Sequence, residues 1–157
     1  MKITFCGHKD VHELDAVERW LFDVCRELIL QGAVEFYLGG YGGFDHLSAA
    51  VLRELKKAHP QIRLILVLPY LNSSMLTEGY DESVYPPLES APKRFAISRR
   101  NEWMVQECDA VVSYVTHGWA VLRSRWNMLG GRKDEFSFMN SKMPASYKCV
   151  VCRHLLV

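Results

Sequence analysis

Short apolar runs alternate with longer segments of helical periodicity along the first 119 residues. The apolar runs are typical of strands covered on both faces, and the longer segments repeat apolar residues every three or four positions, as on one face of a helix. The predicted strands span residues 2–6, 36–38, 62–68 and 109–115, and the predicted helices span about 12–31, 44–58 and 92–108. This alternation predicts an α/β fold with a mainly parallel sheet and right-handed crossovers.

A glycine-rich loop follows the second predicted strand and leads directly into a predicted helix. It consists of the pairs Gly39-Gly40 and Gly42-Gly43, with Tyr41 between them. Glycine has no Cβ atom to block a ligand, and the N–H groups at a helix N-terminus favour anions. Asp45 lies in the first turn of the helix, where it either caps the helix or bonds a sugar hydroxyl. Four glycines in this context favour a phosphate or nucleotide site over a tight turn with an aspartate cap.

Three segments are expected to meet at one edge of the sheet. The first strand runs into Gly7-His8-Lys9, the second into the glycine loop, and the third into Pro69-Tyr70. In parallel sheets, ligands bind beyond the carboxyl ends of the strands. We therefore expect Gly7 and His8 to contribute to ligand binding beside the glycine loop.

Residues 69–92 interrupt the alternation of strands and helices. Four prolines discourage regular structure there, and Tyr70, Tyr80 and Tyr85 supply aromatic rings. A loop of this length in a compact domain is usually functional or disordered. Two interpretations remain open: a packed lid on which a base or ribose stacks, and tyrosines that pin a surface loop.

The predicted helix at 92–108 carries polar groups on or beside its apolar stripe. The stripe consists of Ile97, Met104, Val105 and Cys108, with Asn101 inside it and Arg100 at its border. A buried polar group without a partner costs about 1–3 kcal/mol, so both polar residues need partners. We expect Arg100 to reach a phosphate with its planar guanidinium, and Asn101 either to join that site or to bond backbone at a strand end. The start of the helix is basic, which also fits a solvated surface, through Lys93, Arg94 and Arg99.

The composition is that of an ordinary globular domain. The 157 residues carry a net charge of +1, which does not point to nucleic acid or an anionic membrane. No apolar run reaches the roughly 20 residues of a membrane helix, and the first residues do not fit a signal peptide, so we expect a cytoplasmic protein without a membrane partner. Five scattered cysteines fit reduced thiols. Cys149 and Cys152 form a C-x-x-C motif without a second ligand pair, so we expect no metal site.

The strand before Gly7, the glycine loop and Ser98-Arg99-Arg100-Asn101 together resemble the SLOG superfamily, the Rossmann-like group named for the Smf/DprA and LOG proteins. The resemblance is greatest to the small bacterial YpsA-like branch, which shares the loop Tyr-Asp-Glu-Ser-Val-Tyr-Pro-Pro at 80–87. It covers residues 1–119. It implies a Rossmann-like three-layer sandwich that binds a nucleotide or nucleotide derivative at the glycine loop.

The same resemblance bears on catalysis. LOG-type phosphoribohydrolases carry a similar loop, P-G-G-x-G-T-x-x-E, in which the glutamate is catalytic. Aligned on the first glycine pair, this chain has Leu38 for the proline, Gly43 for the threonine and His46 for the glutamate. Asp45 is the one candidate for a catalytic carboxylate, and it lies about 100° around a helix from the aligned position.

Three functions are compatible with these features. The first is a sensor or regulatory protein that binds a nucleotide, ADP-ribose or NAD. No cofactor is certain beyond a nucleotide-type ligand, and the protein can form a homo-oligomer. The second is an N-glycosidase acting on nucleoside monophosphates through Asp45. The third is a single-stranded nucleic-acid module using Arg94, Arg99 and Arg100. The near-neutral charge and the lack of a long basic stripe weigh against nucleic acid as a partner.

Residues 120–157 form an atypical tail. Proteins of the family that this chain resembles continue after the last strand with a Gly-Gly pair, a helix and a final strand, whereas the tail has neither clear caps nor a periodic pattern. This pattern fits the loss of a single guanine nucleotide from a run of guanines that spans the codon of Trp119 and the next codon. In the restored reading frame, permitted codons for Ala120 to Phe136 can encode the amino acids G-G-A-A-K-S-L-E-Y-A-R-R-K-K-G-R-I. We therefore interpret 120–157 as a frameshifted tail, with its C-x-x-C motif as a by-product.

A frameshifted tail has consequences that can be tested. It would leave one sheet edge exposed, favour association through that edge, and weaken nucleotide binding by removing part of the phosphate-binding edge. We expect the codons from Ala120 to Arg132 to spell the corresponding part of that string in the shifted frame. Sequencing of the gene checks this, and codons that spell anything else would exclude the interpretation.

Overall fold

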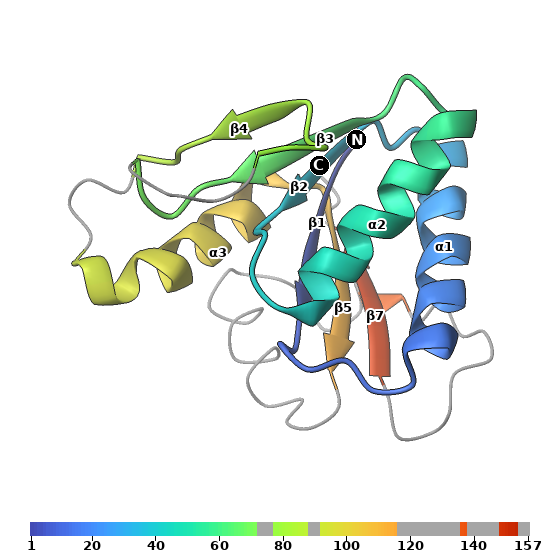
Figure 1. Cartoon of the computed structure of the whole chain (residues 1–157), viewed down its shortest axis with the longest axis horizontal. Coiled ribbons are helices and arrows are strands. Elements are labelled where there is room, and N and C mark those ends of the chain that lie inside the picture. The colour runs from blue at the N-terminus through green and yellow to red at the C-terminus, as the bar shows by residue number, and fades with distance from the viewer. Residues whose placement is uncertain (72–76, 88–91, 116–135, 138–147, 154–157) are drawn as a thin grey trace.

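The computed structural model describes residues 1–71, 77–87, 92–115, 136–137 and 148–153 (Figure 1). The strands are β1 (Lys2–Gly7), β2 (Glu35–Leu38), β3 (Arg63–Val67), β4 (Glu82–Val84), β5 (Ala110–Val115), β6 (Phe136–Ser137) and β7 (Lys148–Arg153). The helices are α1 (Leu14–Leu30), α2 (Gly43–Ala58) and α3 (Ala96–Glu107), and a 3-10 turn, η1 (Lys93–Phe95), leads into α3. The predicted Rossmann-like α/β fold is confirmed.

The strands form one sheet in the order β4-β3-β2-β1-β5-β7-β6. Five neighbouring strands, β4 to β5 in this order, run parallel. The chain adds β2, β3 and β4 on one side of β1 and then adds β5 on the other side. The sheet therefore has a topological switch point between β1 and β5, which is where open α/β sheets form ligand crevices.

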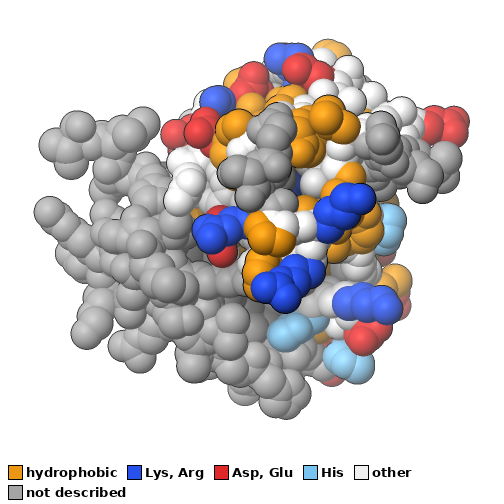
Figure 2. Space-filling view, turned by 90° about the vertical axis from the view of Figure 1, so that its left-hand side faces the viewer, with side chains coloured by type: hydrophobic (Ala, Val, Ile, Leu, Met, Phe, Trp, Pro, Cys, Tyr) orange, Lys and Arg blue, Asp and Glu red, His pale blue; other side chains and the backbone are white. Residues whose placement is uncertain are grey.

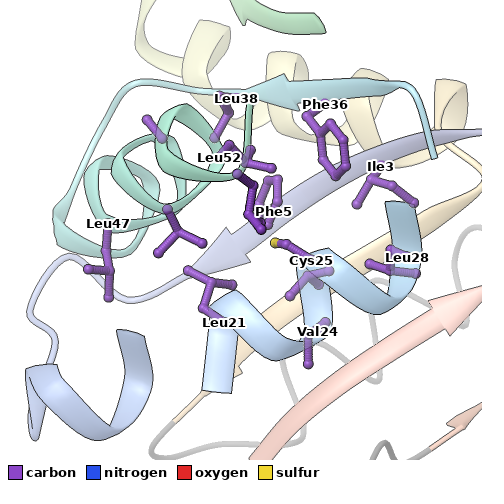
Figure 3. Packing of buried hydrophobic residues seen from close by; sticks show 14 of the residues in the cluster. Ile3, Phe5, Leu21, Val24, Cys25, Leu28, Phe36, Leu38, Leu47 and Leu52 are labelled. Carbon is purple, nitrogen blue, oxygen red and sulfur yellow. The ribbon is translucent and has the colours of Figure 1, made fainter. Parts of the chain in front are cut away.

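Helices cover both faces of the sheet because its strands are apolar on both faces. On one face, Phe36 and Leu38 pack with the buried sides of α1 and α2 (Figure 3). Tyr37, which lies between them in the strand, packs on the other face with Met104 of α3. Alternate residues of a strand point to opposite faces, so these two clusters place α3 opposite α1 and α2.

The buried face of α3 differs from the predicted stripe. Its buried residues are Ala96, Arg100 and Met104, spaced four apart. Ile97, predicted to lie on the stripe, is 40% exposed, and Asn101 is half-buried. Met104 and Cys108 are buried as predicted, but the prediction was wrong for Arg100, because it treated arginine as a border residue. In the structure the guanidinium is at the centre of the buried face, where main-chain carbonyls accept its hydrogen bonds.

The stretch 69–92 contains regular structure that the sequence analysis did not predict. Strand β4 adds to the edge of β3, and Leu68 N–H donates to Val84 O at 2.8 Å. The Asp81 carboxylate accepts the N–H of Leu64 at 2.7 Å and so fixes the approach to this strand. A three-residue strand held by main-chain bonds needs no periodic side chains, so periodicity misses it. Tyr80 is half-buried against the main core, as expected for a packed loop.

The tail contributes one long strand to the sheet. Strand β7 pairs antiparallel with β5 over six residue pairs, from Ala110 with Arg153 to Val115 with Lys148. The expectation that a frameshifted tail leaves the edge of β5 exposed is therefore wrong. Most of the rest of 120–157 lies outside the described residues, so the origin of the tail remains a prediction. Within the part of the chain that the structure describes, no helix is both long and apolar enough to cross a bilayer.

Candidate functional site

The candidate site lies at the carboxyl edge of the parallel strands, beside the switch point. Gly7 is the last residue of β1 and His8 follows it, and the glycine loop 39–43 follows the neighbouring strand β2. The loop runs directly into the N-terminus of α2 (Figure 1). The structure therefore brings together the segments after β1 and β2, as the sequence predicts.

The glycine loop adopts a conformation that requires glycine at two positions. Gly40 and Gly42 have φ angles of 69° and 89°. Any Cβ atom at Gly42 would also lie 3.1 Å from the Cα atom of Lys9. Gly43 N–H donates to Lys9 O at 2.6 Å, which fixes the loop against the segment after β1. This bond occupies one N–H of the first turn of α2.

Other N–H groups at this helix end are available. The N–H groups of Phe44 and Asp45 have no acceptor among the described residues. The first N–H groups of a helix have no intrahelical partner, and together they attract anions. The geometry of the loop is therefore compatible with a phosphate at the start of α2.

Arg100 is the most unusual residue at this edge. Its side chain reaches from α3 to the ends of two strands, where Nη1 donates to Gly39 O at 2.5 Å and to Val67 O at 2.9 Å. Arg100 is 1% exposed, yet its Nε has no hydrogen-bond partner among the described residues. The structure shows no ion pair between this guanidinium and a described carboxylate. Burial lowers the pKa of Arg100, and the nearby Asp45 carboxylate opposes that shift.

Asp45 faces Arg100 across Gly39. A Cβ atom at position 39 would lie 2.6 Å from Arg100 Nη1 and 2.8 Å from Asp45 Oδ2, so only glycine allows both groups to come this close. The same carboxylate oxygen accepts Tyr41 N–H at 3.1 Å and thereby holds the loop. Burial raises the pKa of Asp45 to about 6, although the Tyr41 N–H and the Arg100 charge act against this. Asp45 thus both stabilises the glycine loop and contributes a carboxylate beside Arg100.

His8 and Gly7 complete the site on the β1 side. His8 Nε2 is buried without a hydrogen-bond partner among the described residues, and the imidazole lies edge-on to Tyr114 at 6.4 Å between ring centroids. Gly7 has a packing role, because a Cβ atom there would collide with the ring and Cβ of the buried Phe44. Gly7 therefore lets the start of α2 approach β1, which places the glycine loop.

Several predicted residues do not contribute to this cluster. The Asn101 side chain makes no hydrogen bond with the described residues. His46, which was not predicted as a site residue, is exposed. Arg99 pairs with Glu102 of its own helix at 3.1 Å. The Arg94 guanidinium lies over the ring of Phe95, at 4.7 Å from its centroid. Figure 2 shows Lys and Arg side chains next to hydrophobic side chains on the side of the molecule that lies at the left in Figure 1.

Some groups at the site were not predictable from the sequence. The carbonyl oxygens of Lys9 and Val67 hold the loop and Arg100, and main-chain atoms carry no sequence signal. The role of Phe44 depends on a tertiary contact with Gly7. Among the described residues, no three His, Cys, Asp or Glu side chains are placed to hold a metal ion.

Comparison of the chain with protein-family models gives no match, and comparison with curated proteins gives none either.

Proposed function

We propose that the protein binds a nucleotide or nucleotide derivative, of the ADP-ribose, NAD or nucleoside monophosphate type, at the glycine loop, and that it acts as a sensor or regulatory protein. The observation that carries this proposal is the buried guanidinium of Arg100. Its Nε lacks a described partner, and no described carboxylate forms an ion pair with it. The Asp45 carboxylate acts on this guanidinium without forming an ion pair, so a further anion close to Arg100 would stabilise the buried cation.

The surroundings of Arg100 fit a phosphate as that anion. The free N–H groups at the start of α2 and the unpartnered His8 Nε2 lie at the same edge of the sheet. Main-chain N–H groups, arginine and histidine are the donors that phosphate binding uses in proteins. The position of the site beside the switch point of a Rossmann-like sheet favours a nucleotide over an isolated inorganic ion.

An N-glycosidase is the second candidate, and one observation favours it. Burial raises the pKa of Asp45 to about 6, a value suited to proton transfer near neutral pH. Against this, Asp45 Oδ2 already accepts Tyr41 N–H and faces Arg100. Release of ribose 5-phosphate from AMP, lost on Asp45→Asn, would support hydrolysis. If AMP stays intact in the presence of the protein, hydrolysis is excluded and the sensor function stands.

The His8→Ala variant tests the site on the β1 side. We expect it to weaken AMP binding about ten-fold or more, because a hydrogen bond to a charged group contributes about 1.5–3 kcal/mol. Isothermal titration of the full chain with AMP, ADP-ribose and NAD measures this. His59→Ala is the matched control, since His59 lies at the far end of α2 from the glycine loop. Equal affinities for the two variants would show that His8 does not contact the ligand.

A further inference from the structure

Tyr41 is the exposed aromatic residue of the glycine loop. Tyr41 is 44% exposed, and its neighbours Gly40 and Gly42 carry no side chains. The loop backbone at Tyr41 is fixed, because Tyr41 N–H donates to Asp45 at 3.1 Å. The ring therefore projects from a constrained backbone into solvent at the edge where the proposed ligand binds.

The Arg100 guanidinium also orients the Tyr41 ring from one of its faces. The Arg100 guanidinium lies over it, with the central carbon 5.5 Å from the ring centroid. Arg100 is in turn held by the carbonyl oxygens of Gly39 and Val67, so the guanidinium is itself a fixed support. One ring face is thus directed to a buried cation, and the exposed area of the ring remains for another planar group. A cation behind an aromatic ring draws its π electrons away from the outer face, which favours stacking of an electron-rich ring there.

We propose that Tyr41 is the stacking platform for the base of the bound nucleotide, so that the site selects ligands with a purine over sugar phosphates of the same charge. This inference rests on the proposed function and extends it from the phosphate to the base. Stacking of a base on an aromatic side chain tolerates different bases, so the platform explains a preference for ligands that carry a base over sugar phosphates that carry none, without contacts to the edges of the base.

The test compares AMP with ribose 5-phosphate on the full chain by isothermal titration. We expect Tyr41→Ala to weaken AMP binding by about five-fold or more, as loss of one base–aromatic stack does, and to leave ribose 5-phosphate unchanged. Tyr41→Phe keeps the ring and should bind both ligands as the wild type does. Phe95→Ala is the matched control, because Phe95 is 46% exposed and also lies under a guanidinium, that of Arg94.

The outcomes separate this inference from the proposed function. Equal losses of AMP and ribose 5-phosphate in Tyr41→Ala would mean that Tyr41 acts through the loop or Arg100, and would overturn the platform. An unchanged AMP affinity in Tyr41→Ala, or an equal loss in Phe95→Ala, would overturn it as well while nucleotide binding stands. If the wild type binds neither ligand at millimolar concentration, the platform and the proposed function both fail.

Discussion

Replacing Arg100 by alanine is expected to lower the free energy of unfolding by about 3 kcal/mol or more, because hydrogen bonds to charged groups contribute about 1.5–3 kcal/mol each. The side chain donates to Gly39 O and to Val67 O. Without it, two carbonyl oxygens at the ends of β2 and β3 lose their donor inside the protein. For a chain of this size the loss corresponds to a Tm lower by roughly 6–12 °C.

Thermal and urea unfolding of the full chain measure this effect. Arg99→Ala is the matched control: Arg99 is the preceding residue, its side chain is 63% exposed, and its ion pair with Glu102 lies on the surface. We expect the control to change stability by less than about 0.5 kcal/mol. Arg100→Lys retains a positive charge and should be less destabilised than Arg100→Ala. If Arg100→Ala unfolds like Arg99→Ala, the guanidinium does not hold the two strand ends.

The second large effect is a pH dependence that belongs to Asp45. Burial raises its pKa to about 6 in the folded protein, against an ordinary value of 3.8. Between these values the folded state binds more protons than the unfolded state. The free energy of unfolding therefore falls as the pH rises from about 4 to about 6, by as much as about 1–3 kcal/mol from this group. The groups that act on it are the Tyr41 N–H of the glycine loop, Arg100 of α3 and His46 of α2.

The Asp45→Asn variant isolates this contribution. An asparagine oxygen can still accept Tyr41 N–H, but it does not ionise. We expect the variant to gain stability relative to the wild type as the pH rises from 4 to 7, and the two to differ least at pH 4. Urea unfolding of both proteins at several pH values measures the difference, in which the other titrating groups cancel. A difference that does not change with pH would mean that the Asp45 carboxyl titrates in the folded protein as it does in the unfolded chain.

The sequence predicts the elements whose signal is local. The strand that ends at Leu38, the glycine loop and the start of α2 follow one another within a few residues, so their pattern identifies both the loop and its place in the sheet. The helix α1 is equally clear, because its apolar face recurs at helical spacing. These elements carry their own burial pattern, and tertiary contacts did not override it.

The parts that escaped prediction depend on contacts between distant segments. Arg100 lies at the centre of a buried face because the carbonyl oxygens of Gly39 and Val67, 61 and 33 residues away, accept its hydrogen bonds. Gly7 was predicted as a ligand contact, and the structure gives it a packing role against Phe44. Neither role produces a periodic pattern in the sequence. The acceptors of Arg100 are main-chain atoms, which every residue type carries, and the role of Gly7 depends on a contact with a distant side chain.

Crystallisation of the full chain with AMP, NAD or ADP-ribose is the most direct test of nucleotide binding at the glycine loop. We expect density for a phosphate group within hydrogen-bond distance of the loop 39–43 or the start of α2, with Arg100 or His8 on the same group and the base beside Tyr41. Ligand density at another place on the protein, or an empty glycine loop in crystals that hold millimolar nucleotide, would contradict it.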